Sequence, residues 1–298
     1  MPAPAHFITG AELDADRLEF LLHRAAALKE APLSSRALEG RTVALLFNKP
    51  STRTRTSFES GVFELGGHPM VLRADELQLT RGEFVRDTAY VLSRHAAAIG
   101  VRTGDENEIN TLSEHAAVPV INMLSPLHHP CQALADLLTL REAYGSLEGR
   151  VLAYVGDGNN VARSLAILGA LAGMEVRVAA PDGYQLQDTD AVKTDDPAEA
   201  VEGADAVYTD VWVSMSDSDD EAAARREALA PYAITDDLLA RAKPDAFALH
   251  CLPAHPGEEI AESVLYGDRQ RIWDQAENRR HAQKALLELV VSTQRDAG

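Results

Sequence analysis

The chain has 298 residues, 46% of them hydrophobic, and its 28 Lys and Arg against 46 Asp and Glu give a net charge of −18. Such an acidic surface repels nucleic acid and anionic lipid, so neither is expected as a partner. The two cysteines, Cys131 and Cys251, lie far apart and form no CxxC pattern, which argues against a disulfide framework and a zinc site. No signal-peptide pattern is visible, and the best apolar run (165–174) is too short to span a bilayer, so we expect a cytoplasmic protein.

Strand-like and helical patterns alternate through the first half of the chain. Strands are expected at 41–47, 68–72, 97–102 and 118–123, and helices at 56–65, 86–95 and 131–145. This alternation predicts a parallel sheet with helices on both faces.

A second alternating series follows, and the two series meet near residues 142–150. Strands are expected at 150–156, 175–181, 205–213 and 245–253, and helices at 162–174 and 275–291. The acidic run DSDDE (217–221) is expected to form a solvated, mobile loop.

The predicted fold class is α/β, with two doubly wound domains that each have a central parallel sheet and are joined by inter-domain helices. We expect a first domain over 1–141 and a second over 142–274, with the C-terminal helix (275–298) packing back on the first.

The stretch STRTR (51–55) follows a predicted strand and a turn at Pro50, where a helix begins. Unpaired backbone N–H groups and the positive end of the helix dipole favour an anion there. A single hydroxyl side chain is enough to cap a helix, whereas Arg53 and Arg55 add forked donors suited to phosphate or carboxylate. A solvated helix start remains the alternative.

GDGNN (156–160) lies between a predicted strand and helix, as a dinucleotide-binding loop would. Val161 replaces the third glycine of that fingerprint, and no acidic residue clearly ends the next strand, so a nicotinamide cofactor is disfavoured. The asparagines suit a small polar ligand, or they only form the turn.

Four further motifs place polar side chains at helix starts or strand ends. His129 precedes Pro130 at a predicted helix start, and Asp210 and Cys251 end predicted strands, where open α/β sheets bind ligands. His129 and Cys251 also have plain structural readings, as a cap neighbour and as a buried thiol. ENRRH (277–281) would ordinarily be a solvated basic face of the last helix.

Taken together, STRTR, HPCQ, GDGNN, DVWVSM, HCLP and ENR, in this order and at these intervals, resemble the transcarbamylases, and within them the ornithine carbamoyltransferases. The resemblance runs from about residue 5 to residue 292. STRTR with HPxQ marks users of carbamoyl phosphate in general, and DxWxSM with HCLP is selective for ornithine.

The resemblance implies a carbamoyl phosphate site. Its expected residues are Ser51, Thr52, Arg53, Thr54, Arg55, Gln78, Arg102, His129, Gln132, Cys251, Leu252 and Arg279. In the family, the residue matching Gln78 comes from the neighbouring subunit, which implies a homotrimer or a multiple of trimers. Arg102 and His129 would polarise the carbonyl group as its carbon becomes tetrahedral.

The resemblance also implies an L-ornithine site of Asn160, Asp210, Ser214 and Met215, with Asp210 and Cys251 beside the reacting amine. The implied catalytic residues are Arg102, His129, Asp210 and Cys251. The family has a cis peptide before the proline of HCLP, so Leu252–Pro253 is expected to be cis. An amine of pKa near 10.4 is neutral in only about 1 of ~2,500 molecules at pH 7, so the site must favour deprotonation. This chemistry needs neither a metal nor a cofactor.

The chain departs from the family pattern at several positions. Ser216 replaces the glycine of the family's mobile SMG loop, Thr80 replaces a usual glycine in LQLTRGE, and Pro256 stands where arginine is common. The stretch between 186 and 194 is shorter than usual, which predicts the loss of one edge element.

Three hypotheses stay open on the sequence. The first is a biosynthetic enzyme that makes L-citrulline and phosphate. The second is a carbamoyltransferase for another ω-amino acid or a diamine, although the residues matched to the amino-acid end argue against a diamine. The third is a non-catalytic anion-binding homologue, which would be expected to have lost Asp210, Cys251 or the STRTR arginines.

Overall fold

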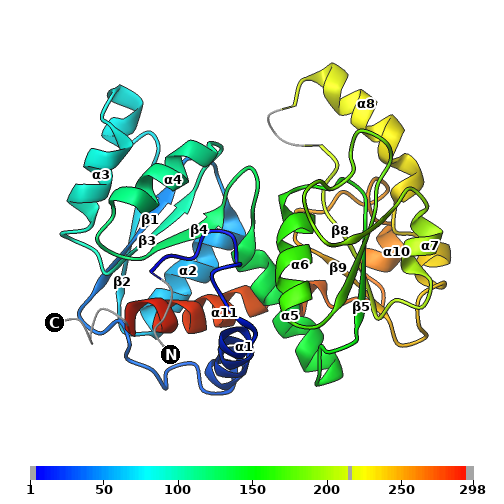
Figure 1. Ribbon diagram of the computed structural model, residues 1–298, viewed down its shortest axis with the longest axis horizontal. Helices are drawn as coiled ribbons and strands as arrows, with labels where there is room; N and C mark the ends of the chain where they lie inside the picture. The colour runs from blue at the N-terminus through cyan, green and yellow to red at the C-terminus, as the bar shows by residue number, and fades with distance from the viewer. Residues whose placement is uncertain (1–4, 214–216, 293–298) are drawn as a thin grey trace. The chain divides into compact units, whose positions relative to one another are not determined.

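The computed structural model describes residues 5–213 and 217–292, and the chain folds into two compact units. Unit 1 comprises residues 1–138 and 277–298, and unit 2 comprises residues 139–276. Each unit has a parallel sheet flanked by helices, which confirms the predicted α/β class (Figure 1). No helix within the described residues is both long and apolar enough to cross a membrane.

The sheet of unit 1 has four parallel strands in the order β2-β1-β3-β4. These strands are β1 (Thr42–Phe47), β2 (His68–Arg73), β3 (Ala98–Arg102) and β4 (Val120–Leu124). Strands β1 and β3 are almost wholly buried, because helices cover both faces of the sheet, and their sequences therefore read as continuous apolar runs.

Helices α3 (Val85–Leu92) and α4 (Glu106–His115) lie on one side of this sheet, and α2 (Thr52–Glu64) and α11 (Ile272–Ser292) lie on the other (Figure 1). The side chains of Leu92 and Leu112 belong to one buried apolar cluster with Leu46 and Val101 of the sheet. Helix α1 (Ala15–Glu30) and the short helix η1 (Gln78–Arg81) complete the unit.

The sheet of unit 2 has five parallel strands in the order β7-β6-β5-β8-β9. These strands are β5 (Val151–Val155), β6 (Glu175–Ala179), β7 (Val192–Thr194), β8 (Ala206–Thr209) and β9 (Phe247–His250). Helix α6 (Asn160–Leu171) lies on one side of the sheet in Figure 1, and α7 (Pro197–Val201) and α10 (Glu262–Leu265) lie on the other. The remaining elements of unit 2 are α8 (Asp219–Leu229), η2 (Ala230–Tyr232) and α9 (Asp236–Leu239), while α5 (Pro130–Tyr144) and α11 contribute residues to both units.

One expectation from the sequence is wrong. The acidic run at 217–221 is not a loop throughout, because α8 begins at Asp219, with Ser218 and Glu221 forming a reciprocal capping box. Three acidic residues in the first turn of α8 also complement the helix dipole. At the edge where the loss of one element was expected, residues 180–191 contain no helix, and strand β7 is present and pairs with β6.

Because all strands within a unit run parallel, their carboxyl ends meet at one edge of each sheet. In unit 1 this edge carries Arg102, the last residue of β3, and the segments that follow β1 and β4, which contain Ser51 and His129. In unit 2 it carries the segments after β5, β8 and β9, which contain Asn159, Asp210 and Cys251. Ligand-binding side chains are expected at these two edges.

A fully buried lysine anchors α11 within unit 1. Lys284 Nζ donates to the Leu28 and Pro32 carbonyls at 3.1 and 3.2 Å and to Glu64 Oε2 at 2.5 Å. The half-buried Arg280 reaches the other oxygen of the same carboxylate at 3.1 Å. These contacts connect α11 with the end of α1 and with α2.

We predict that Lys284→Met lowers the free energy of unfolding by about 3 kcal/mol, because it removes a buried charge partner and leaves two carbonyls without their donor. Arg280→Met is the matched control. It removes a more exposed partner of Glu64 and should cost less than about 1 kcal/mol. Urea unfolding followed by circular dichroism measures both, and equal losses would contradict the assigned anchoring role of Lys284.

Candidate active site

The predicted anion-binding loop of unit 1 forms the start of α2. Ser51 is the N-cap, and its hydroxyl accepts a hydrogen bond from the Thr54 backbone N–H at 3.2 Å. The other first-turn N–H groups of such a helix start face outward from its N-terminus and favour an anion. Of the two arginines, Arg55 is exposed and forms an ion pair with Glu59 at 2.9 Å.

A buried arginine from the C-terminal helix reaches this loop. Arg279 is 2% exposed; its Nη2 donates to Thr54 Oγ1 at 2.7 Å and its Nη1 donates to Gln132 Oε1. The Gln132 amide nitrogen in turn donates to Asp136 Oδ1 at 2.8 Å. Arg279 of α11 is thereby hydrogen-bonded to two other predicted site residues, one on α2 and one on α5.

His129 lies at the centre of a positively charged group. Its pKa is held well below the usual value, chiefly because the imidazole is buried and also because Arg279, Arg102 and Arg53 are close. The imidazole is therefore neutral at pH 7, so one ring nitrogen carries a proton to donate. Positive side chains around a neutral donor suit an anionic ligand that also has a polarisable carbonyl oxygen.

A buried carboxylate that the sequence did not single out holds the segments that follow β1 and β3. Glu108 of α4 accepts hydrogen bonds from Asn48 Nδ2 at 2.5 and 2.6 Å and from the Thr103 hydroxyl. Asn48 follows β1 and Thr103 follows β3, so Glu108 fixes the chain next to both the 51–55 loop and Arg102. No sequence motif pointed to this residue.

The remaining predicted residues of unit 1 lie at its surface. Thr52 is exposed at the first position of α2, and Gln78 is exposed at the start of η1. Neither Gln78 nor Arg55 joins the hydrogen-bonded group around Arg279 through a contact seen within the described residues of unit 1.

In unit 2 the structure brings Asp210 and Cys251 together. The Cys251 thiol lies 2.8 Å from Asp210 Oδ1, which also accepts the Val211 backbone N–H at 2.8 Å. Asp210 is 8% exposed and directly follows β8, and Cys251 directly follows β9. A carboxylate and a thiol held side by side at a strand end are suited to binding an amine and to governing its protonation.

The second oxygen of Asp210 is held by Asn159, a neighbour of the predicted Asn160. Asn159 Nδ2 donates to Asp210 Oδ2 at 2.8 Å, and Asn159 Oδ1 caps α6. Asn160 is the first residue of α6 and is partly exposed. Ser214 and Met215, the other two predicted ornithine residues, lie outside the described residues, as does Ser216.

The turn that carries Asn159 is tightly packed. Gly158 N–H donates to the Tyr184 carbonyl at 2.8 Å, and a Cβ at Gly158 would lie 2.7 Å from that oxygen. Arg225 of α8 forms an ion pair with Asp157 of the same turn and contacts the Tyr184 ring. Burial raises the pKa of Asp157, and the Arg225 guanidinium opposes this shift.

The HCLP segment is fixed by a second buried network. His250 Nδ1 accepts the Leu252 backbone N–H at 2.8 Å, and His250 Nε2 contacts Glu259 Oε1 at 3.1 Å. The Leu252–Pro253 peptide is cis, which confirms the prediction.

Within the described residues, the ligand atoms of Asp210, His250 and Cys251 lie close enough for a metal ion, as do those of His255, Glu258 and Glu259. In the first group, however, both His250 nitrogens and the Cys251 thiol are already engaged.

Two family models match the chain. Residues 5–142 match the carbamoyl-P binding domain of aspartate/ornithine carbamoyltransferase, and residues 148–290 match its Asp/Orn binding domain. The chain belongs to the aspartate/ornithine carbamoyltransferase family. This membership confirms the resemblance inferred from the six motifs.

Individual members of the aspartate/ornithine carbamoyltransferase family are similar over nearly the whole chain. An ornithine carbamoyltransferase from Acidothermus cellulolyticus is 52% identical over 96% of this chain and 96% of its own length. The anabolic ornithine carbamoyltransferase of Pyrococcus furiosus is 49% identical over 86% of this chain and 85% of its own length. Among solved structures, an ornithine carbamoyltransferase from Pyrococcus furiosus superposes with a TM-score of 0.92 at 44% identity, covering 97% of this chain and 98% of its own.

We predict that His129 stays neutral in the native protein at pH values where the unfolded chain is protonated. The unfolded state then binds more protons below pH about 6.5, so the free energy of unfolding should fall as the pH drops below this value and should not depend on His129 above it. The buried His281, whose pKa is lowered to about 4, acts in the same direction.

The measurement is histidine NMR between pH 8 and 5, with the His129 signal assigned by its loss in His129→Gln. The His129 resonance should not move over this range, and His129→Gln should show a shallower loss of stability with falling pH. A titration midpoint near 6.5 for His129 would contradict the electrostatic description of this group.

Proposed function

We propose that this protein transfers the carbamoyl group of carbamoyl phosphate to the δ-amino group of L-ornithine, giving L-citrulline and phosphate in the direction of arginine biosynthesis. The observation that carries the proposal is the pairing of two kinds of site. Unit 1 has Arg53, Arg102 and Arg279 around the neutral His129. Unit 2 has the Asp210 carboxylate beside the Cys251 thiol. The names of the relatives support the same activity, and the Pyrococcus furiosus relative is called anabolic.

The residues of unit 1 would bind carbamoyl phosphate. The N–H groups at the start of α2, with Arg53, would hold the phosphate, and Arg279 with Gln132 would face the carbamoyl end. His129 and Arg102 would donate to the carbonyl oxygen as it gains negative charge. Because His129 is already neutral, it would act by hydrogen bonding and would not add a charge.

The residues of unit 2 would bind ornithine and prepare its amine. Asp210 would accept hydrogen bonds from the δ-amino group, and the Cys251 thiol would influence how readily that group loses its proton. Asn160, with Ser214 and Met215, would hold the amino-acid end. The δ-nitrogen forms a bond to the carbonyl carbon, the carbon–oxygen bond to phosphate breaks, and the departing phosphate accepts the proton of the amine. Catalysis would come mainly from orientation and electrostatic stabilisation.

The proposed assembly is a homotrimer, or a multiple of trimers, in the cytoplasm. Gln78 supports this proposal, because its side chain is exposed on η1 and makes no contact with the Arg279 group within the described residues of unit 1. A neighbouring copy of the chain would present its own Gln78 to the carbamoyl phosphate site.

The test is citrulline formation from carbamoyl phosphate and ornithine, with putrescine, lysine and aspartate assayed in parallel. Arg53→Ala should reduce turnover by about 10²-fold or more, because it removes a charged donor from the anion site. Arg94→Ala, a change at an exposed arginine after α3, is the control and should leave the rate unchanged.

Two results would overturn parts of the proposal. Turnover of another acceptor in preference to ornithine would keep the carbamoyl phosphate site and refute the ornithine assignment. Binding of carbamoyl phosphate without turnover of any acceptor would support the non-catalytic alternative.

A further inference from the structure

Asn159 uses both ends of its amide, and the two ends serve different parts of unit 2. Its Oδ1 accepts from the backbone N–H groups of Val161 and Ala162 at 2.9 and 3.2 Å, and from the Tyr154 hydroxyl at 3.2 Å. Its Nδ2 donates to Asp210 Oδ2 at 2.8 Å. The residue therefore joins the start of α6 to the carboxylate that follows β8.

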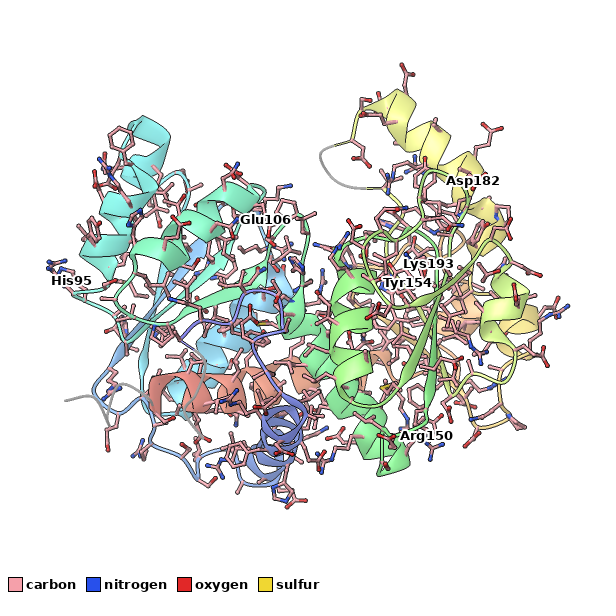
Figure 2. The ribbon with its side chains drawn as sticks, in the orientation of Figure 1. His95, Glu106, Arg150, Tyr154, Asp182 and Lys193 are labelled. Atoms are coloured by element: carbon pink, nitrogen blue, oxygen red, sulfur yellow. The ribbon has the colours of Figure 1, made fainter. Side chains whose placement is uncertain are left out.

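The orientation of this amide is fixed by its partners. Two backbone N–H groups can only donate, so the atom that faces them must be the amide oxygen. Tyr154, labelled in Figure 2, donates to the same oxygen from β5 in the interior of unit 2. The NH₂ group is thereby directed at Asp210 without freedom to flip.

We propose that Asn159 is a positioning residue that holds Asp210 as an oriented carboxylate beside the Cys251 thiol. With Oδ2 held by Asn159, the other oxygen is left to accept from Val211 and Cys251. A donor that cannot itself ionise stabilises the charged form of a carboxylate. The kinetic consequence of this role rests on the proposed function, whereas its effect on Cys251 does not.

Several titratable groups lie around Asp210, whereas the Asn159 amide that holds it does not ionise. They are Tyr154 on β5, Asp157 in the turn before α6, and His250 and Cys251 at the end of β9, with Arg225 of α8 ion-paired to Asp157. Burial, together with Asp210 and Asp157, raises the pKa of Tyr154 well above its usual value, so its hydroxyl remains a donor. Because Asp157 and Asp210 already lie close together, a further negative charge at position 159 would strongly affect the ionisation of its neighbours.

The competing explanation is that Asn159 only caps α6. Aspartate and serine are also good N-caps, so Asn159→Asp and Asn159→Ser should both retain the helix start. Neither can donate to Asp210 as the amide does. The two variants therefore separate capping from the positioning of Asp210.

In Asn159→Asp, two carboxylates would lie about 3 Å apart, and such a pair takes up a proton instead of ionising fully. We expect the low-pH limb of the kcat profile to move toward alkaline pH by about one unit or more. The rate at pH 7 should fall about 10-fold or more, while the KM for carbamoyl phosphate stays within about twofold. Asn159→Ser removes the donor without adding a charge, so it should lower kcat and move the limb less than Asn159→Asp does. The control Asn110→Asp adds the same charge at an exposed position on α4 and should match the wild type.

Alkylation of Cys251 by iodoacetamide gives a readout that does not depend on turnover. Cys131 is completely buried, so the reaction reports on the partly exposed Cys251. The thiolate is the reactive form, and an added carboxylate nearby disfavours it. The pH at which alkylation reaches half its maximal rate should therefore be higher in Asn159→Asp than in Asn110→Asp, at unchanged urea-unfolding midpoints.

The proposal requires the alkylation shift and, where the wild type makes citrulline, the shift of the kcat profile. If either shift is absent in Asn159→Asp, the positioning role is overturned and Asn159 is a helix cap only. A wild type that makes no citrulline refutes the proposed function instead, and the alkylation profile alone then decides the role of Asn159.

Discussion

The buried guanidinium of Arg279 is the contact on which the anion site of unit 1 depends. It extends from the C-terminal helix and donates to Thr54 at the start of α2 and to Gln132 in the first turns of α5. Both oxygens belong to uncharged side chains, so these bonds fix the arginine without cancelling its charge. The same charge, with those of Arg53 and Arg102, helps to keep His129 neutral. The Arg279 guanidinium thus holds the start of α2 in place and also helps to lower the pKa of His129.

Local and net charge have opposite signs in this protein. The chain carries −18 overall, yet three arginines and a helix N-terminus act at one sheet edge of unit 1. A field inside a partly buried site is set by the nearest charges, because distant surface carboxylates are screened by solvent and salt. Unit 2 shows the reverse arrangement, in which the Asp210 carboxylate lies beside the Cys251 thiol. An anionic and an amine substrate are suited to these two environments respectively.

The sequence predicted the strands of both sheets well, because strands buried on both faces are continuous apolar runs such as TVALLF in β1. It failed at α8, where the acidic run was given more weight than the Ser218 and Glu221 capping pair within it. Strand β7 has three residues, two of them exposed, and is too short and polar to be recognised by its pattern.

The motifs identified which segments form the candidate site, but they did not show which contact each side chain makes. GDGNN has two adjacent asparagines, and only the structure shows that Asn159 caps α6 and holds Asp210. STRTR has two arginines, of which Arg55 forms an ion pair with Glu59. Glu108 belongs to no motif, because its role depends on a contact with Asn48, which is distant in the chain and adjacent in the fold.

The most direct test of this account is the equilibrium binding of carbamoyl phosphate, measured by titration calorimetry without a second substrate. The comparison is between the wild type, Arg279→Met and the exposed-arginine control Arg94→Met, all at one ionic strength and with matched thermal unfolding. The account predicts that Arg279→Met weakens binding by about 10-fold or more and that the control binds as the wild type does. Equal affinity in all three proteins would show that the buried arginine is structural and that the anion site lies elsewhere.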